Sequence, residues 1–330
     1  MRRRDFISGI AGSAAAVWPL SARAQQPDRM RRLGVLMGSE DHADARKLFA
    51  EFQQALEQLG WSYGGNIQID IRWGSDDERR MTYAKELVRL SPDVVFAGPS
   101  NAVLALQKET RSIPIVFVRA ADPVGQGIVD SLARPSGNIT GFSNPDFPLL
   151  GKWVQLLKDI VPTVSRVGLM IHTINAASAH YYRLLDELAP SLGITPVAAP
   201  IGEIGEIEPI FKALAQQPNS GLVVPGDSVL EARAIRELIV RLAASHRLPV
   251  VYAQRSFAAD GGLMSYGIDP AEVFRRAASY VDRILRGEKP SDLPVQQATK
   301  MDFVINLKTA RTLGYNVPLA LLASADEVIE

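Results

Sequence analysis

The chain has 330 residues, with 36 basic and 36 acidic side chains and no cysteine. The lack of cysteine excludes disulfides, thiolate metal sites, a cysteine nucleophile and a lipid-modified cysteine anchor. The balanced charge argues against a nucleic-acid or anionic-membrane surface, and the length favours two domains of ordinary size.

The N-terminal segment MRRRDFISGIAGSAAAVWPLSARAQQ is typical of an export signal. Basic residues precede an apolar stretch from Ile10 to Leu20, which is too short to span a bilayer, and Ala22-Arg23-Ala24 has the A-x-A pattern of a cleavage site. Arg3-Arg4-Asp5-Phe6-Ile7 resembles a twin-arginine signal. We predict that residues 1–24 are removed and that a periplasmic chain without a lipid anchor begins near Gln25. The alternative is a flexible basic N-terminus.

Along the rest of the chain, short apolar runs alternate with amphipathic segments, a pattern that predicts parallel sheets covered by helices. A first series of strands is expected at 32–36, 67–73, 93–97, 113–118 and 138–142, and a second at 166–171, 195–199, 221–224 and 248–252. Apolar residues at helical spacing predict helices over 153–161 and 235–242. Ser75 with Glu78, and Asp269-Pro270 with Glu272, predict two further helix starts with capping boxes.

Residues 92–118 and 220–253 share one order of features: an apolar strand, a glycine, a polar helix start, a helix, and a strand that opens with an apolar residue and proline. We interpret them as the same strand–helix–strand unit in two similar lobes. Coincidence between unrelated units is the alternative.

Ligands of parallel sheets bind outside the carboxyl ends of the strands, where the free N–H groups of helix starts favour anions. The candidate residues at these positions are Ser39, Ser100, Asn101 and Asp122 in lobe one, and His172, Thr173, Asn175, Asp227 and Gln254 in lobe two. Ser39, Ser100, Asn101 and Asp227 could instead only cap helices, and Asp122 could only stabilise a turn.

Signatures of catalysis are missing from the sequence. The four histidines, His42, His172, His180 and His246, form no H-x-x-x-H pair, and neither a G-x-S-x-G motif nor a phosphate-binding P-loop occurs. Gly125-Gln126-Gly127 lacks the third glycine of a dinucleotide fingerprint. The prediction is a binding protein without metal, cofactor or catalytic residues.

Several stretches resemble the substrate-binding proteins of ABC uptake transporters, in the subfamily similar to tryptophan/tyrosine-binding proteins. They include D-P-V-G from Asp122, N-I-T-G from Asn138 and G-G-L-M-S-Y-G from Gly261. Two further stretches are FRRAASYVDRILRGEKPSDLPVQQATKMDFVINLKTARTLG and the closing ADEVIE. The similarity extends from about Arg31 to Glu330.

This resemblance implies a type I periplasmic-binding fold of the α/β class, with two Rossmann-like lobes, parallel sheets and a hinge of three crossovers. The crossovers are expected near 141–144, 254–258 and 293–300. Lobe one would contain 31–142 and 259–292, and lobe two 143–258 and 293–330.

The function that the resemblance implies is capture of a small, amino-acid-like solute by hinge closure, and its delivery to an inner-membrane permease with its ATPase. The chain would act as a monomer. By position, the residues implied to line the cleft are Ser39, Ser100, Asn101, Asp122, Asp227 and Tyr266. His172-Thr173 stands where many relatives have Asn-Pro, which leaves the identity of the ligand open.

For an amino acid, we expect the helix start at Ser100-Asn101 to bind the carboxylate and Asp122 or Asp227 to bind the ammonium. Tyr252 or Tyr266 would cover an apolar or aromatic side chain. Two alternatives stay open: an exported sensor module for a membrane receptor, and an exported enzyme with an unrecognised site.

Overall fold

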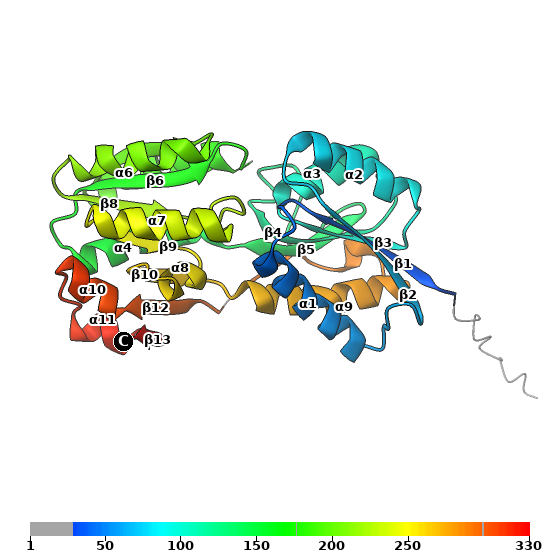
Figure 1. The fold of residues 1–330 in the computed structure, drawn as a ribbon. Helices are drawn as coiled ribbons and strands as arrows, with labels where there is room; N and C mark the ends of the chain where they lie inside the picture. Colours follow the sequence, from blue (N-terminus) through cyan, green and yellow to red (C-terminus); the bar gives the residue numbers. More distant parts are fainter. Residues whose placement is uncertain (1–28, 176, 299) are drawn as a thin grey trace, which may run out of the picture.

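The computed structural model describes residues 29–175, 177–298 and 300–330, which form two α/β lobes side by side (Figure 1). The predicted export signal lies outside the described residues. No helix of the described part is long and apolar enough to cross a membrane.

Lobe one is built on a parallel sheet with the strand order β11-β5-β4-β3-β1-β2. Its central strands are buried along their length, as expected of a sheet that helices cover on both faces. The strands are β1 (Arg31–Met37), β2 (Ile67–Trp73), β3 (Val94–Gly98), β4 (Ile115–Ala121), β5 (Ile139–Asn144) and β11 (Gln296–Gln297).

Lobe two is built on a sheet with the order β13-β12-β10-β9-β8-β6-β7, which is parallel except for the antiparallel pair β10–β12. The strands are β6 (Arg166–His172), β7 (Thr195–Ile201), β8 (Ser220–Val224), β9 (Val250–Tyr252), β10 (Met264–Gly267), β12 (Asp302–Asn306) and β13 (Glu327–Ile329).

The predicted internal similarity is confirmed by the topology. The run β4-β3-β1-β2 in one sheet occupies the same places as β9-β8-β6-β7 in the other. The two similar segments are β3–α3–β4, where α3 is Ser100–Glu109, and β8–α7–β9, where α7 is Arg233–Ser245. Because both sheets are parallel in this run, the carboxyl ends of the equivalent strands point toward the same kind of edge, at the boundary between the lobes.

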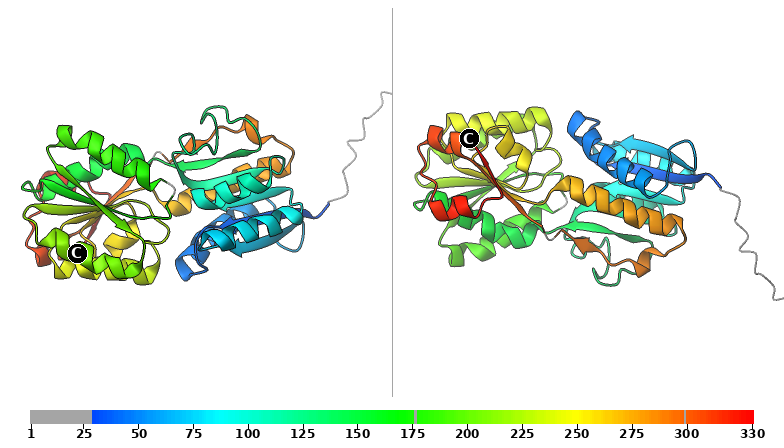
Figure 2. Two further views of the ribbon diagram at one scale, coloured as in Figure 1. Left: turned by 90° about the horizontal axis from the view of Figure 1, so that it is seen from above. Right: turned by 90° about the horizontal axis from the view of Figure 1, so that it is seen from below.

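Helices cover both faces of each sheet (Figure 2). In lobe one, α1 (Ala43–Gln58) and α9 (Pro270–Leu285) share a core with one face, while α2 (Asp77–Arg89) and α3 cover the other. Phe52 of α1 stacks on Phe96 of β3 with ring centroids 4.2 Å apart. In lobe two, one face carries α4 (Asp146–Ile160), α5 (Ser178–Leu192), α10 (Leu307–Leu313) and α11 (Leu319–Ala323), and the other carries α6 (Ile207–Ala215), α7 and α8 (Arg255–Ala259).

The second crossover lies later in the chain than predicted. Residues 259–267 were expected in lobe one, but β10 pairs with β9 and β12 in the sheet of lobe two. The chain therefore returns to lobe one only between Gly267 and Pro270, where α9 begins. The expected start of the last lobe-two segment at 293 is also early, because β11 still pairs with β5 of lobe one.

One of the two predicted helix caps is displaced by a residue. Asp76, not Ser75, caps α2, and its carboxylate accepts the backbone N–H of Arg79 at 2.8 Å. The carbonyl of Ser75 instead accepts from the guanidinium of Arg80. Asp269 caps α9 as predicted, with Pro270 in the first turn.

Candidate functional site

A pocket of about 250 Å³ lies between the lobes, at the carboxyl ends of the strands. Lobe one contributes the end of β1, the start of α1, the ends of β3 and β4, and the start of α9, whereas lobe two contributes the loop after β8 and the starts of α7 and α8. Its apolar wall includes Met37, Ala45, Leu48, Pro99, Val118, Pro270 and Phe274.

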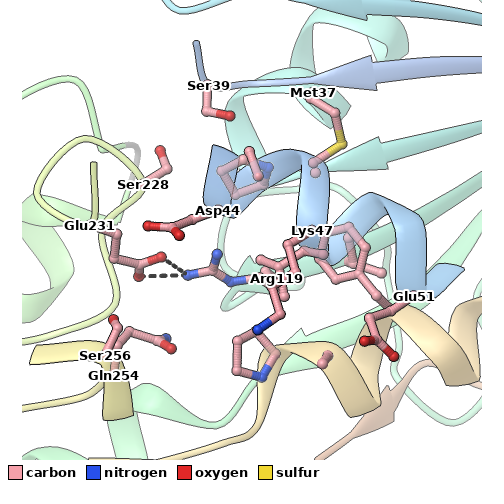
Figure 3. A pocket seen from close by; sticks show the side chains of 18 of the residues that line it. Met37, Ser39, Asp44, Lys47, Glu51, Arg119, Ser228, Glu231, Gln254 and Ser256 are labelled. Carbon is pink, nitrogen blue, oxygen red and sulfur yellow. Dashed lines mark hydrogen bonds and ion pairs between the residues drawn. The ribbon is translucent and has the colours of Figure 1, made fainter. Parts of the chain in front are cut away.

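An ion pair crosses this pocket from one lobe to the other (Figure 3). Nη2 of Arg119 lies 2.6 Å from Oε1 and 2.8 Å from Oε2 of Glu231. The side chains are 12% and 16% exposed, so this interaction is screened less than a surface pair. The pocket thus holds a cation of lobe one and an anion of lobe two in contact.

Local backbone geometry directs Arg119 toward the opposite lobe. It has a left-handed conformation, with φ of 59°, at an irregularity in the β4–β5 register between Val118 and Ala120. Such irregularities turn a side chain away from the direction that the regular strand would give it. Glu231 is fixed in the loop after β8, where Oε1 also accepts the backbone N–H of Asp227 at 3.1 Å.

Arg236 makes a second contact between the lobes. Its Nη1 donates to Oδ2 of Asp44 in α1 at 2.9 Å and to the carbonyl of Glu231 at 2.8 Å, while its Nε donates to Asp260 at 2.6 Å. Burial acts to lower the pKa of Arg236, but the hydrogen bonds to Asp260 and Asp44 outweigh it and raise the pKa above its ordinary value. The guanidinium stays charged and holds both lobes.

A narrower space of about 30 Å³ adjoins the pocket and shares Pro99, Arg119 and Ser228 with it. It contains the start of α3, where the side-chain amide of Asn101 donates to the carbonyl of Ile174 in lobe two at 2.8 Å. Four of the predicted site residues line this space: Ser100, Asn101, Asn175 and Asp227. Two others, Ser39 and Gln254, line the larger pocket.

Asp227 is nearly saturated by its own lobe. Its side chain is buried, and Oδ2 accepts the backbone N–H of His172 at 3.0 Å and the amide of Asn175 at 3.2 Å. Oδ1 accepts the backbone N–H groups of Val229 at 2.9 Å and Leu230 at 3.2 Å. Four donors fill its strongest acceptor positions, so this carboxylate fastens two loops of lobe two together.

The remaining predicted residues line neither space. Asp122 accepts the backbone N–H of Gly125 at 3.0 Å and lies 3.3 Å from Nδ1 of His180 in lobe two. His172 accepts the backbone N–H of Ile174 through Nδ1 at 3.2 Å, and the backbone of Thr173 pairs with Ile201. The side chains of Asp122 and His172 thus stabilise turns, and Asp122 also contacts the opposite lobe.

The two tyrosines predicted to cover a ligand, Tyr252 and Tyr266, line neither of the two spaces. Tyr252 is fully buried and stacks on Phe257 with centroids 4.5 Å apart, because its position in β9 points it into the core beneath α7 and α8. Tyr266 packs edge-on against Phe303 beside α4, on the face of lobe two that α4 and α5 cover.

The main charged residues of the pocket were missed by the sequence-based predictions: Asp44, Arg119, Glu231 and Arg236. A signal for Arg119 was present, since a cation directly after the buried run Ile115–Val118 must find a partner at the strand end. The pairing with Glu231 depends on how the lobes meet, which the sequence does not display. Among the described residues, no group of three or more histidine or acidic side chains could hold a metal ion.

Comparisons with solved structures agree with this two-lobed architecture. A Streptococcus pneumoniae ABC domain in complex with L-Trp is 25% identical, with a TM-score of 0.82 and coverage of 91% of this chain and 99% of that one. The ligand-free, open structure of a Clostridium difficile substrate-binding protein with adhesive properties has the same identity, 25%, and coverages of 91% and 99%, but a TM-score of 0.67. The lobes described here are thus arranged more like those of the ligand complex.

The family model for ABC transporter substrate binding protein matches residues 40–329, so the chain belongs to this family of solute-binding proteins. Among curated proteins, a tyrosine-binding protein of Clostridioides difficile (strain R20291) is 25% identical over 274 residues, which are 83% of this chain and 78% of that protein. The predicted family and its type I periplasmic-binding fold are confirmed.

Proposed function

We propose that this substrate-binding protein captures an L-amino acid with an aromatic side chain in the pocket of about 250 Å³ between its lobes. The observation that carries the proposal is the composition of this pocket, where an apolar wall of Met37, Leu48 and Phe274 lies beside the charged pair Arg119–Glu231. Such a pocket accommodates an apolar side chain and provides one charge of each sign for an amino acid's head group.

Capture would proceed through closure of the lobes. The contacts that Arg119, Arg236 and Asn101 make across the boundary belong to the closed arrangement, and a ligand that touches both lobes adds further contacts to it. The higher TM-score to the L-Trp complex than to the open structure supports this view of the state.

The start of α3 is a less suitable place for the ligand carboxylate than the sequence suggested. In this arrangement only about 30 Å³ is available there, close to the room needed by one water molecule. The side chain of Asn101 is engaged with Ile174. We therefore place the whole ligand in the larger pocket.

We place the mature protein outside the inner membrane, as a monomer that delivers its ligand to a permease with an associated ATPase. Membership of the substrate-binding family supports the transport role, and the export-type pattern of residues 1–24 supports the location.

A thermal-shift screen of residues 25–330 against the twenty amino acids, sugars, purines and aromatic acids tests the proposal. At a hundred times its dissociation constant, a ligand adds about 2.7 kcal/mol to the free energy of unfolding. We expect tryptophan, tyrosine or phenylalanine to raise the melting temperature by a few degrees, as this energy implies for a chain of this size. Stabilisation by sugars or purines alone would refute the amino-acid assignment.

A further inference from the structure

The pair Arg119–Glu231 differs from the other ion pairs that cross the boundary between the lobes. Among the described residues, these are Arg236–Asp44 and His180–Asp122. Arg236 is bound by Asp260 as well as by Asp44, and Asp122 lines neither space at the boundary. Both arginine pairs have their two residues in the wall of the large pocket. Arg119 and Glu231 join the lobes directly across this pocket (Figure 3).

The Glu231 carboxylate occupies a position suited to a ligand carboxylate. One nitrogen of Arg119 reaches both of its oxygens, at 2.6 and 2.8 Å. A guanidinium forms such charge-assisted hydrogen bonds with carboxylates in general. The α-carboxylate of an amino acid is the same chemical group, and Arg119 lines the pocket. It can therefore replace Glu231 on Arg119 without leaving the guanidinium uncompensated.

Glu231 is also the acceptor best placed for the ammonium group of the ligand. The predicted acceptors do not serve, because Asp227 already accepts four hydrogen bonds and Asp122 lies outside the pocket. The other acids of the pocket wall form ion pairs with arginines other than Arg119. Asp44 pairs with Arg236, and Glu51 and Asp269 pair with Arg275. Once released from Arg119, the largely buried carboxylate of Glu231 is an anion directly beside the ligand.

The geometry points to a recognition device for zwitterions: the ligand inserts between Arg119 and Glu231, with its carboxylate on Arg119 and its ammonium on Glu231. This inference rests on the proposed function and assigns its specificity. Each charge of the ligand contacts a residue of a different lobe. The direct ion pair between the lobes is thus replaced by two ion pairs with the ligand. Molecules that carry only one of the two charges leave a partly buried charge without its partner and bind weakly.

Titration calorimetry with three probes tests the assignment: L-tryptophan, tryptamine without the carboxylate, and indole-3-propionate without the ammonium. The same set is measured for L-tyrosine, tyramine and 3-(4-hydroxyphenyl)propionate. We expect the wild-type protein to bind the amino acid on the order of 100-fold more tightly than either analogue. Arg119→Gln should weaken the amino acid and the acid but not the amine, and Glu231→Gln should weaken the amino acid and the amine but not the acid.

The matched controls are Arg255→Gln and Glu327→Gln, which break an ion pair within lobe two with distances of 2.6 and 2.8 Å. Neither residue lines the pocket. They should leave the affinities of all three probes unchanged. Melting temperatures and circular dichroism establish that each variant is folded. Arg119→Lys retains the positive charge and should therefore retain part of the preference for carboxylates.

Two failures are distinguishable. If the wild-type protein binds the amino acid but the Arg119 and Glu231 variants lose affinity equally for all three probes, the pair only holds the lobes together and the zwitterion assignment is wrong. If the wild-type protein binds no amino acid, the proposed function and the assignment fall together.

Discussion

At the scale of single residues, Asp227 illustrates how a carboxylate in a ligand-binding position can serve the fold instead. It is 3% exposed, and its two oxygens join the end of β6, the side chain of Asn175 and the loop after β8. Because these loops carry Glu231 and Ser228 into the pocket, Asp227 determines where the ligand-facing groups of lobe two lie. We infer that its contribution to binding is indirect.

We expect Asp227→Ala to lower the free energy of unfolding by about 2–3 kcal/mol, because four donors, two of them in buried hydrogen bonds, lose a charged acceptor. Urea denaturation measures this loss. Asp227→Asn, which retains one acceptor oxygen, should lose less. A variant of full stability that has lost its ligand affinity would instead show that Asp227 contacts the ligand directly.

At Tyr252, removal of a polar group should stabilise the protein. Its hydroxyl is buried without a hydrogen-bond partner among the described residues, and burial raises the pKa of this phenol above its ordinary value. Tyr252→Phe should therefore stabilise the protein by up to about 1 kcal/mol and leave ligand affinity unchanged. A loss of affinity in this variant would restore the predicted ligand contact.

The pH dependence of Tyr252 has a definite sign. Since its pKa is higher in the folded protein, the unfolded chain ionises first, near the ordinary tyrosine value of about 10. The contribution of Tyr252 to the free energy of unfolding is constant below that pH and becomes unfavourable as the pH rises further. In urea titrations between pH 8 and 11, Tyr252→Phe should lose less stability than the wild type; parallel curves would contradict the assignment.

At the scale of secondary structure, all nine strands predicted from the apolar runs occur, because buried parallel strands need continuous apolar stretches on both faces. The strands that were missed, β10 to β13, are two to five residues long. The partner of such a short strand is decided by the path of the chain rather than by its own composition. For that reason the run around Met264 was assigned to the wrong lobe. The pocket residues Arg119 and Glu231 could not be paired for the same reason, since their contact requires the final arrangement of both lobes.

Gly267, the last residue of β10, is required by close packing at the second crossover. A Cβ atom at this position would lie 1.9 Å from the backbone oxygen of Ala253, which immediately precedes Gln254 of the pocket. We expect Gly267→Ala to lower stability by at least about 2 kcal/mol, because backbone atoms must shift.

Gly151→Ala is the matched control in helix α4. No atom lies within 4 Å of a Cβ at this position, so the substitution should stabilise the helix by about 0.5–1 kcal/mol. Thermal unfolding of the two variants compares them directly. Equal effects at both positions would contradict the packing account of Gly267.

At the scale of the whole molecule, two lobes of similar topology meet along a boundary that side chains of both signs bridge. These bridges contribute to the balance between open and closed forms, because each is lost when the lobes separate. Ligand affinity therefore depends on these bridges. A bridge that favours the closed form lowers the free energy needed to close the lobes around a ligand.

A substitution at Asp44 tests this coupling without changing a buried residue. The side chain of Asp44 is 47% exposed, and it forms an ion pair with Arg236 of the other lobe. Asp44→Asn should weaken ligand binding by about two- to fivefold at low salt, in line with an interaction of 0.5–1 kcal/mol, and the difference should shrink at high salt. Asp41→Asn, which breaks an exposed pair with Arg46 within lobe one, is the control and should leave the affinity unchanged.

The central claim, that an amino acid is bound between the lobes, is tested most directly by a crystal structure of the mature protein grown with L-tryptophan or L-tyrosine. We predict electron density for the ligand in the pocket between α1, α9 and the loop after β8, with its carboxylate on Arg119 and its ammonium on Glu231. Density for the ligand outside this pocket, or an intact Arg119–Glu231 pair beside a bound ligand whose head group touches neither residue, would contradict the account.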